Sequence, residues 1–225
     1  MDFVSIFMMW ITVYAIVFCL MPIGMCLDWH RKGSSEGFSS VNLVIPCLMM
    51  SMWLRYNLLI QDMGQVFLNG TCLTLFICYL LVYDFYKTNK KYLHYQLSVA
   101  SAIFISVYFY VDSLPEKEGI SAMGTCATAI QVLSSGGMLY DMGRAIKLQT
   151  MEYIPAAMTF GGGLFGLQFL LLGILTRDFY ITISNLFGVV LMAAQLTLYV
   201  VYPPLTWRVP LLGVGPAQKT KSKKQ

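Results

Sequence analysis

Two asparagines stand in stretches of the chain that are otherwise almost wholly apolar. Asn69 lies in VFLNGTCLTLFICYLLVYDFY, residues 66–86, and Asn185 lies in a similar stretch at 179–202. A carboxamide both donates and accepts hydrogen bonds, and burying it in an apolar medium without a partner is costly. Each asparagine therefore serves one of two purposes: it holds two helices together by a hydrogen bond, or it contacts a polar ligand.

The composition indicates that these stretches cross a membrane. Of the 225 residues, 57% are hydrophobic and only 12% are charged, and the mean hydropathy is +0.65. A helix that spans the hydrocarbon core needs about 20 mostly apolar residues. Seven such segments are expected, at about 3–27, 38–60, 65–86, 95–111, 120–142, 154–175 and 179–202. Asn69 also begins an acceptor pattern for N-glycosylation, Asn-Gly-Thr, but its place inside a span predicts that it carries no glycan.

The basic residues indicate the orientation of the chain. With the N-terminus outside, 12 of the 15 Lys and Arg residues fall in inner segments and only two in outer ones. Because cytoplasmic loops carry an excess of Lys and Arg, we expect an outside N-terminus and a cytoplasmic C-terminus. The first apolar stretch has no basic residues before it, which favours a retained span over a cleaved signal peptide. The net charge of +4 then reflects topology and does not indicate nucleic-acid binding.

The two ends of the chain share a pattern at an offset of 116 residues. The segment WLRYNLLIQDMGQVFLNG (53–70) aligns with FLLLGILTRDFYITISNL (169–186). The matched pairs are Trp53 with Phe169, Asp62 with Asp178, Asn69 with Asn185, Tyr83 with Tyr199 and Tyr86 with Tyr202. Matching spacing together with matching polar residues indicates an internal repeat of three helices.

The repeat and the number of spans together predict the architecture. Three spans reverse the side of the membrane, so one further helix must lie between two repeats that run in the same direction. The expected fold is an all-α integral membrane protein, with two parallel three-helix repeats joined by a linker helix (3+1+3). The expected divisions are a first repeat, an inner loop with linker helix and outer loop, a second repeat and a basic cytoplasmic tail, at 1–87, 88–118, 119–203 and 204–225.

This pattern resembles the SWEET sugar transporters. The resemblance covers roughly residues 5–205 and rests on GFSS…W..YN....D......N in the first half and MEYIP…D......N..G......QLTLYVVYP in the second. It implies a facilitative, bidirectional uniporter that moves mono- or disaccharides by alternating access. It also implies the plasma membrane, with the Golgi or other internal membranes as alternatives. The expected partners are a sugar and membrane lipids, and a homo-oligomer is left open.

Four residues are expected to bind the sugar, and the resemblance assigns the two asparagines to this role. Asn69 and Asn185 would face each other across the axis between the repeats, where a planar amide can bind two hydroxyls. Trp53 and Phe169 each precede an asparagine by 16 residues, and their aromatic faces can stack on sugar rings. Ordinary interhelical packing is the alternative for all four.

Three further residues are expected to form an outer gate. Asp62 and Asp178 are expected at outer helix ends, where they would form a gate with Tyr56 that closes in the inward-facing state. Arg55 is expected to extend outward to Asp62. The alternative for both carboxylates is simple solvation at the ends of helices.

The expected hinges are residues that interrupt or loosen helices. Pro22 and Pro155 match hinge prolines of the family, and a third hinge is expected at Gly137. Two other family proline positions hold Asn42 and Met138 here, so the hinges of this chain depart from the usual pattern.

Several classes of function are disfavoured by what the sequence lacks. No Asp or Glu lies in the middle of a predicted span, which favours uniport over ion-coupled transport. The sequence has no Ser-His-Asp set, HExxH or P-loop, so neither an enzyme nor a cofactor or metal site is expected. A seven-helix receptor and another carrier of the PQ-loop superfamily are the alternatives. The latter normally shows Pro-Gln where this chain has Pro22 followed by Ile23.

Overall fold

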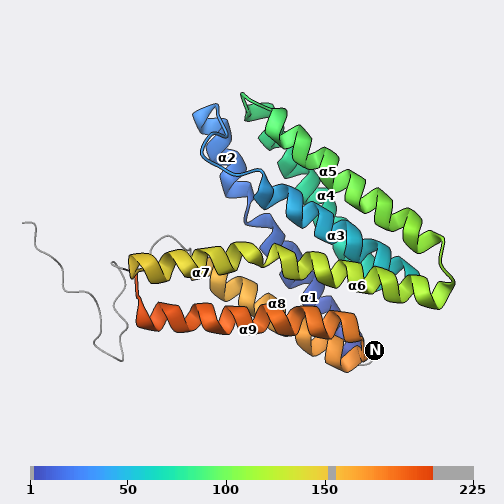
Figure 1. The fold of residues 1–225 in the computed structure, drawn as a ribbon. Helices are drawn as coiled ribbons and strands as arrows, with labels where there is room; N and C mark the ends of the chain where they lie inside the picture. Colours follow the sequence, from blue (N-terminus) through green and yellow to red (C-terminus); the bar gives the residue numbers. More distant parts are fainter. Residues whose placement is uncertain (1–2, 152–155, 205–225) are drawn as a thin grey trace, which may run out of the picture.

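The computed structural model describes residues 3–151 and 156–204, and all regular elements in those ranges are helices (Figure 1). They are α1 (Phe3–Leu20), α2 (Ile23–Lys32), α3 (Val41–Leu59), α4 (Met63–Tyr86), α5 (Lys91–Asp112), α6 (Glu116–Ser134), α7 (Gly136–Leu148), α8 (Ala156–Thr176) and α9 (Phe179–Val201). These nine helices of the described residues correspond to the seven expected spans, because the first and fifth spans are each broken into two helices.

Five helical segments are long and apolar enough to cross a membrane: Phe3–Lys32, Met63–Tyr86, Lys91–Asp112, Thr159–Thr176 and Phe179–Val201. The helix α3 and the pair α6 and α7 are less apolar, since α3 carries Arg55 and Asn57 and α6 begins with Glu116. These helices nevertheless pack among the other five, with α3 against α4 and α6 against α9. Their polar residues can therefore face protein instead of lipid.

The first span is broken at Pro22. Proline has no N–H to donate to the carbonyl of Phe18, which accepts from the backbone N–H of Met21 at 3.1 Å instead. In the same last turn of α1, the carbonyl of Cys19 accepts a hydrogen bond from the hydroxyl of Tyr79 at 2.8 Å. A side chain of α4 thus stabilises the broken end of α1.

The fifth span is broken at Ser135 without a proline. At the 116-residue offset, Met21 and Pro22 correspond to Gly137 and Met138, so the two breaks fall two to three residues apart in the repeat. Each repeat therefore has a divided first span, whether or not it carries the proline.

The ends of the two repeats remote from the N-terminus are closed by the same backbone hydrogen bond. The N–H of Ser35 donates to the carbonyl of Tyr86 at 3.2 Å, and the N–H of Met151 donates to the carbonyl of Tyr202 at 3.0 Å. Both members of the second pair lie 116 residues after those of the first. The repeat seen in the sequence thus extends to the backbone.

The opposite ends of the two repeats, where α4 and α9 begin, share the same helix cap. The Oδ1 atom of Asp62 caps α4 by accepting from the N–H of Gln65 at 3.1 Å, and Oδ1 of Asp178 caps α9 by accepting from Ile181 at 2.9 Å. A residue of positive φ precedes each cap: Gln61 (59°) and Arg177 (55°). These turns set the direction in which α4 and α9 begin.

Two seams join the repeats, one between α1 and α8 and the other between α3 and α6. Because α6 is the counterpart of α1 and α8 that of α3, the repeat relates one seam to the other. The helix α5 packs on α3 and α6 and leaves most of its surface exposed. At the end remote from the N-terminus, α2 packs on α4 and α7 packs on α9, and Figure 1 shows α2 and α7 apart.

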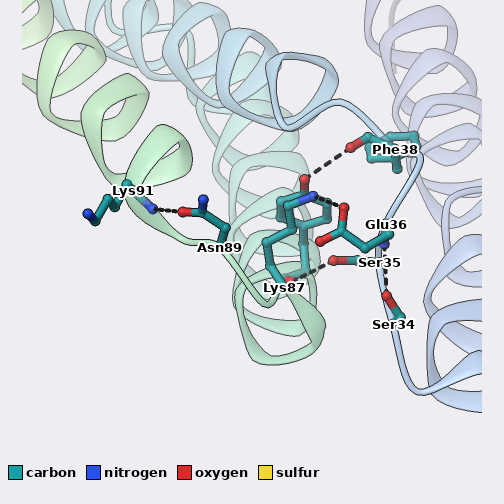
Figure 2. Close-up of polar contacts among 8 residues, drawn as sticks. Ser34, Ser35, Glu36, Phe38, Lys87, Asn89 and Lys91 are labelled. Atoms are coloured by element: carbon teal, nitrogen blue, oxygen red, sulfur yellow. Dashed lines mark hydrogen bonds and ion pairs between the residues drawn. The ribbon is translucent and has the colours of Figure 1, made fainter.

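The loop between α2 and α3 is bound to the end of α4 (Figure 2). Lys87 Nζ lies 2.9 Å from a carboxylate oxygen of Glu36, and the hydroxyl of Tyr83 donates to the carbonyl of Phe38 at 3.0 Å. The hydrogen bond to the Glu36 carboxylate raises the pKa of Lys87 above its ordinary value. These contacts hold the inner end of the first repeat together.

Candidate functional site

A cavity of about 140 Å³ lies between the two seams and takes residues from both repeats. Its wall includes all four residues predicted to bind the ligand: Trp53, Asn69, Phe169 and Asn185. The described residues that line it include no charged side chain. The cavity is smaller than the roughly 300–1,000 Å³ of typical ligand pockets, so it suits a small neutral ligand.

The two asparagines have the same local geometry. Asn69 Nδ2 donates to the carbonyl of Gln65 at 3.0 Å, and Asn185 Nδ2 donates to the carbonyl of Ile181 at 2.8 Å. Each bond stays within the helix of its asparagine and joins equivalent positions of the repeat. Neither of these two bonds ties two helices together. Asn185 also lies 3.5 Å from Gln131 of α6, at the limit of hydrogen-bond distance, so strong interhelical hydrogen bonding is disfavoured relative to the ligand interpretation.

The two aromatic residues differ in how they are held. Trp53 is buried, and its indole N–H donates to Oε1 of Gln131 at 2.7 Å. Phe169 is half-buried and packs on the ring of Phe165, with centroids 4.8 Å apart. Phe165 and Met49 also line the cavity, and their bulk contributes to its small volume.

Gln131 is a cavity residue that the sequence analysis did not identify. Its side chain lies between two predicted residues, since Oε1 accepts from Trp53 and Nε2 lies 3.5 Å from Oδ1 of Asn185. Its counterpart in the first repeat is Ala15, so a search for paired polar residues passes over it. A polar residue inside an apolar span was the signal that could have found it.

The predicted outer gate is partly assembled. The hydroxyl of Tyr56 in α3 donates to Oδ2 of Asp178 at 2.8 Å, and this bond crosses from the first repeat to the second. Tyr56 is only 3% exposed, and it packs between the rings of Trp53 and Tyr180 at centroid distances of 5.6 and 5.7 Å. The bond therefore joins the two repeats at the end of the molecule where α3 ends and α9 begins.

Asp62 does not join this contact. Its two carboxylate oxygens accept from the backbone N–H and the side-chain Nε2 of Gln65, at 3.1 and 2.9 Å. The expectation that Arg55 reaches Asp62 is wrong: Arg55 lies 3.3 Å from Asp112 and 4.6 Å from the ring centre of Tyr108. The reason is that α5 runs beside α3 and offers both a carboxylate and an aromatic face to the guanidinium.

The predicted hinge residues are in different surroundings. Pro22 is buried at the break between α1 and α2, and Gly137 is exposed in the first turn of α7, two residues after the break at Ser135. A methyl group added at Gly137 would meet no atom within 4 Å. Pro155 lies outside the described residues.

Comparisons with known proteins point to one family. A family model described as "Sugar efflux transporter for intercellular exchange" matches residues 3–91 and 121–206. The "Sugar transporter SWEET1" of Drosophila pseudoobscura pseudoobscura is 31% identical over 81% of this chain and 82% of its own length. The "Sugar transporter SWEET1" of Caenorhabditis elegans is 28% identical, over 85% of this chain and 62% of its own length.

The plant protein "Bidirectional sugar transporter SWEET10" of Arabidopsis thaliana is 23% identical, over 82% of this chain and 65% of its own length. The chain thus spans less than two thirds of the nematode and plant relatives. A solved structure of a eukaryotic SWEET transporter superposes with a TM-score of 0.79 at 22% identity, over 89% of this chain and 99% of that one. This likeness confirms the predicted all-α fold of seven spans in a 3+1+3 plan.

Proposed function

Because the chain belongs to the family of sugar efflux transporters for intercellular exchange, we propose that it moves sugars across a membrane by alternating access. The family is one of transporters and not of enzymes, and membership disfavours both the receptor and the other PQ-loop carriers. Two parallel repeats with the substrate at their interface are an arrangement for which this family is itself a standard example.

The central cavity is the observation that carries the proposal. It brings Asn69 and Asn185 from equivalent helices of two repeats into one wall, beside the rings of Trp53 and Phe169. Amides that donate and accept, together with aromatic faces, match a ring that carries hydroxyls on an apolar frame. The volume of about 140 Å³ favours a monosaccharide over a disaccharide.

The contact between Tyr56 and Asp178 supports a proposal for the state of the transport cycle. Tyr56 and Asp178 join the two repeats at the ends where α4 and α9 begin, whereas at the opposite end the main contacts of α2 and α7 in the described residues are with α4 and α9 of their own repeats. We infer an outward-closed state, from which the repeats rock about the cavity to open the other side. The proposed moving bodies are residues 1–87 and 119–203, with hinges near Pro22, Gly137 and Pro155.

Transport is proposed to be uniport in either direction. Ion-coupled carriers need an ionisable group that reports the bound ion to the substrate site. Because none of the described residues lining the cavity is charged, the sugar gradient alone should set the direction of net flux. A protonophore should leave initial uptake nearly unchanged, and a large loss in viable cells would contradict uniport.

We also propose a plasma-membrane location with the N-terminus outside and the C-terminus in the cytoplasm. The support is the excess of Lys and Arg in the segments that this topology places inside.

Uptake measurements test the proposal directly. Radiolabelled glucose, fructose, sucrose and trehalose would be supplied to cells that lack hexose carriers and express the chain, with surface abundance measured in parallel. We expect uptake of at least one monosaccharide above that of cells with empty vector. Confirmed surface expression without uptake or efflux of any of the four sugars would refute the proposal.

A further inference from the structure

The side-chain amide of Gln131 has an orientation that its neighbours determine. An indole N–H can only donate, so the atom of Gln131 that lies 2.7 Å from Nε1 of Trp53 must be the carboxamide oxygen. The NH₂ group then points toward Oδ1 of Asn185, 3.5 Å away. That distance is at the limit for a hydrogen bond, so the NH₂ group keeps donor capacity for a ligand.

The two asparagines are oriented by the same argument. A backbone carbonyl can only accept, so the atoms that bond to the carbonyls of Gln65 and Ile181 must be the NH₂ groups of Asn69 and Asn185. Their carboxamide oxygens are therefore acceptors for a ligand, and each NH₂ group has already given one of its two N–H donors to a carbonyl. Both asparagines line the cavity, as does Gln131.

From these orientations we propose that Gln131 is a third sugar-binding residue and a hydrogen-bond donor of the site. This inference rests on the proposed function. Asn69 and Asn185 accept hydrogen bonds from two hydroxyls of the sugar, and the NH₂ group of Gln131 donates to an oxygen of the same sugar. Trp53 acts as the positioning residue, because its indole N–H holds the amide of Gln131 in this orientation.

The proposed donor also makes the site asymmetric. The asparagines are related by the repeat, but the counterpart of Gln131 in the first repeat is Ala15, which is fully buried and offers no polar atom. A sugar in a symmetric site could bind in two orientations related by the axis. The Gln131 donor is present in the second repeat and has no counterpart in the first. It therefore favours the orientation in which an accepting oxygen of the sugar, either a ring oxygen or a hydroxyl, faces the second repeat.

Deoxy and deoxyfluoro analogues of the transported sugar can test these roles. Fluorine can accept a weak hydrogen bond but cannot donate one. At positions that donate to Asn69 or Asn185, the fluoro analogue should therefore bind as poorly as the deoxy analogue. At the position that faces Gln131, the fluoro analogue should bind better than the deoxy analogue.

The variants would be compared by equilibrium binding of each analogue to purified full-length protein. Gln131→Met keeps the length of the side chain and removes the amide, and one hydrogen bond is worth about 0.5–1.5 kcal/mol, or roughly two- to tenfold in affinity. We expect this drop in affinity for the parent sugar. We also expect the fluoro analogue to lose its advantage over the deoxy analogue, but only at the sugar position that faces Gln131. Trp53→Phe, which keeps a ring but removes the N–H, should reduce the same preference.

Gln96→Met is the matched control, because Gln96 bonds to Ser40 at 2.6 Å and lies outside the cavity. It should leave both affinity and analogue preference unchanged. Unchanged relative affinities in Gln131→Met would overturn the role of Gln131 while leaving the proposed function intact. If the wild-type protein binds none of the sugars, the proposed function itself fails, and this inference fails with it.

Discussion

The hydroxyl of Tyr56 lies 2.8 Å from Oδ2 of Asp178, and this hydrogen bond joins α3 of one repeat to the first turn of α9 of the other. The other oxygen of the same carboxylate caps α9 by accepting from the N–H of Ile181. Asp178 thus connects the start of a helix directly to the contact that closes the outer side. Any movement that separates the repeats there must break the bond to Tyr56 but can leave the cap intact.

Tyr56→Phe should therefore favour the outward-open state. A hydrogen bond to a charged group is worth about 1.5–3 kcal/mol, so the equilibrium should shift by roughly ten- to a hundredfold. Ala127 is fully buried and packs in the same cluster as Tyr56, so Ala127→Cys provides a reporter. In a background without the six native cysteines, an impermeant maleimide applied outside should label it faster when Tyr56 is replaced.

The matched control for this gate experiment is Tyr180→Phe. Its hydroxyl bonds to that of Ser121 at 2.6 Å, and both residues belong to the second repeat. Loss of that hydroxyl removes a bond of similar position without separating the repeats. Equal labelling rates in Tyr56→Phe and Tyr180→Phe would show that the Tyr56 bond does not hold the outer side closed.

The two equivalent aspartates should respond differently to removal. Asp62→Ala removes a helix cap and the bond to the side chain of Gln65, both within the first turn of α4, with an expected loss of about 0.5–2 kcal/mol in stability from the cap. Asp178→Ala removes a cap and the bond to Tyr56 together, so it should lower stability and also raise labelling of the Ala127→Cys reporter. Thermal unfolding and labelling would be measured on the same preparations. An increase in labelling with Asp62→Ala as large as that with Asp178→Ala would contradict this division.

The positions that could be predicted from the sequence are those the repeat marks twice. Asp62 and Asp178, like Asn69 and Asn185, stand at matching places, and their hydrogen bonds match too. The local rules are the same in both halves: an aspartate caps the helix, and an asparagine follows seven residues later. Polar residues that recur at the 116-residue offset therefore identified two residues of the cavity wall, Asn69 and Asn185.

What could not be predicted depends on contacts between distant segments. Gln131 has no polar counterpart, and its place beside Trp53 arises from the seam between α3 and α6. The partner of Arg55 is Asp112, 57 residues away, and not the nearer Asp62. Asp112 ends α5, which packs on α3, and sequence distance does not reveal that neighbour.

Gly137→Ala tests whether the second repeat bends near its divided span. The added methyl would meet no atom within 4 Å, so packing should be preserved while helix propensity rises by about 1 kcal/mol. A stiffer first turn of α7 should slow the turnover of sugar more than it weakens sugar binding. Gly143→Ala is the control, since Gly143 lies later in α7 with equally open surroundings. Equal turnover in both variants would place the hinge elsewhere.

The proposed topology can be checked with epitope tags and a glycosidase. A tag at the N-terminus should bind antibody on intact cells, whereas a tag after Gln225 should do so only after permeabilisation. Asn69 should carry no glycan, because it lies in the seventh position of α4 and lines the cavity. Reversed labelling, or a glycosidase-sensitive mobility shift that disappears in Asn69→Gln, would overturn the topology or the placement of Asn69 within a membrane span.

Asn69→Ala and Asn185→Ala test the central claim that the two amides share one sugar. Each removal should weaken sugar binding by roughly two- to a hundredfold, from about 0.5–3 kcal/mol for a hydrogen bond lost in a site that excludes water. Asn→Asp is the stricter variant at either position. It keeps the acceptor oxygens but removes the NH₂ group that holds the side chain to the carbonyl four residues earlier, and it adds a charge to an apolar cavity, so transport should fail.

The control for these variants is Asn57→Ala. Asn57 is fully buried on α3 outside the cavity, and among the described residues its side-chain amide has no hydrogen-bond partner. Its removal should leave sugar affinity unchanged. If the cavity asparagines serve only to stabilise the fold, their variants should instead show lower surface abundance and melting temperature with normal affinity in the remaining protein. Sugar affinity per folded molecule therefore decides between the two interpretations. Only ligand contact predicts that this affinity falls in Asn69→Ala and Asn185→Ala and stays unchanged in Asn57→Ala.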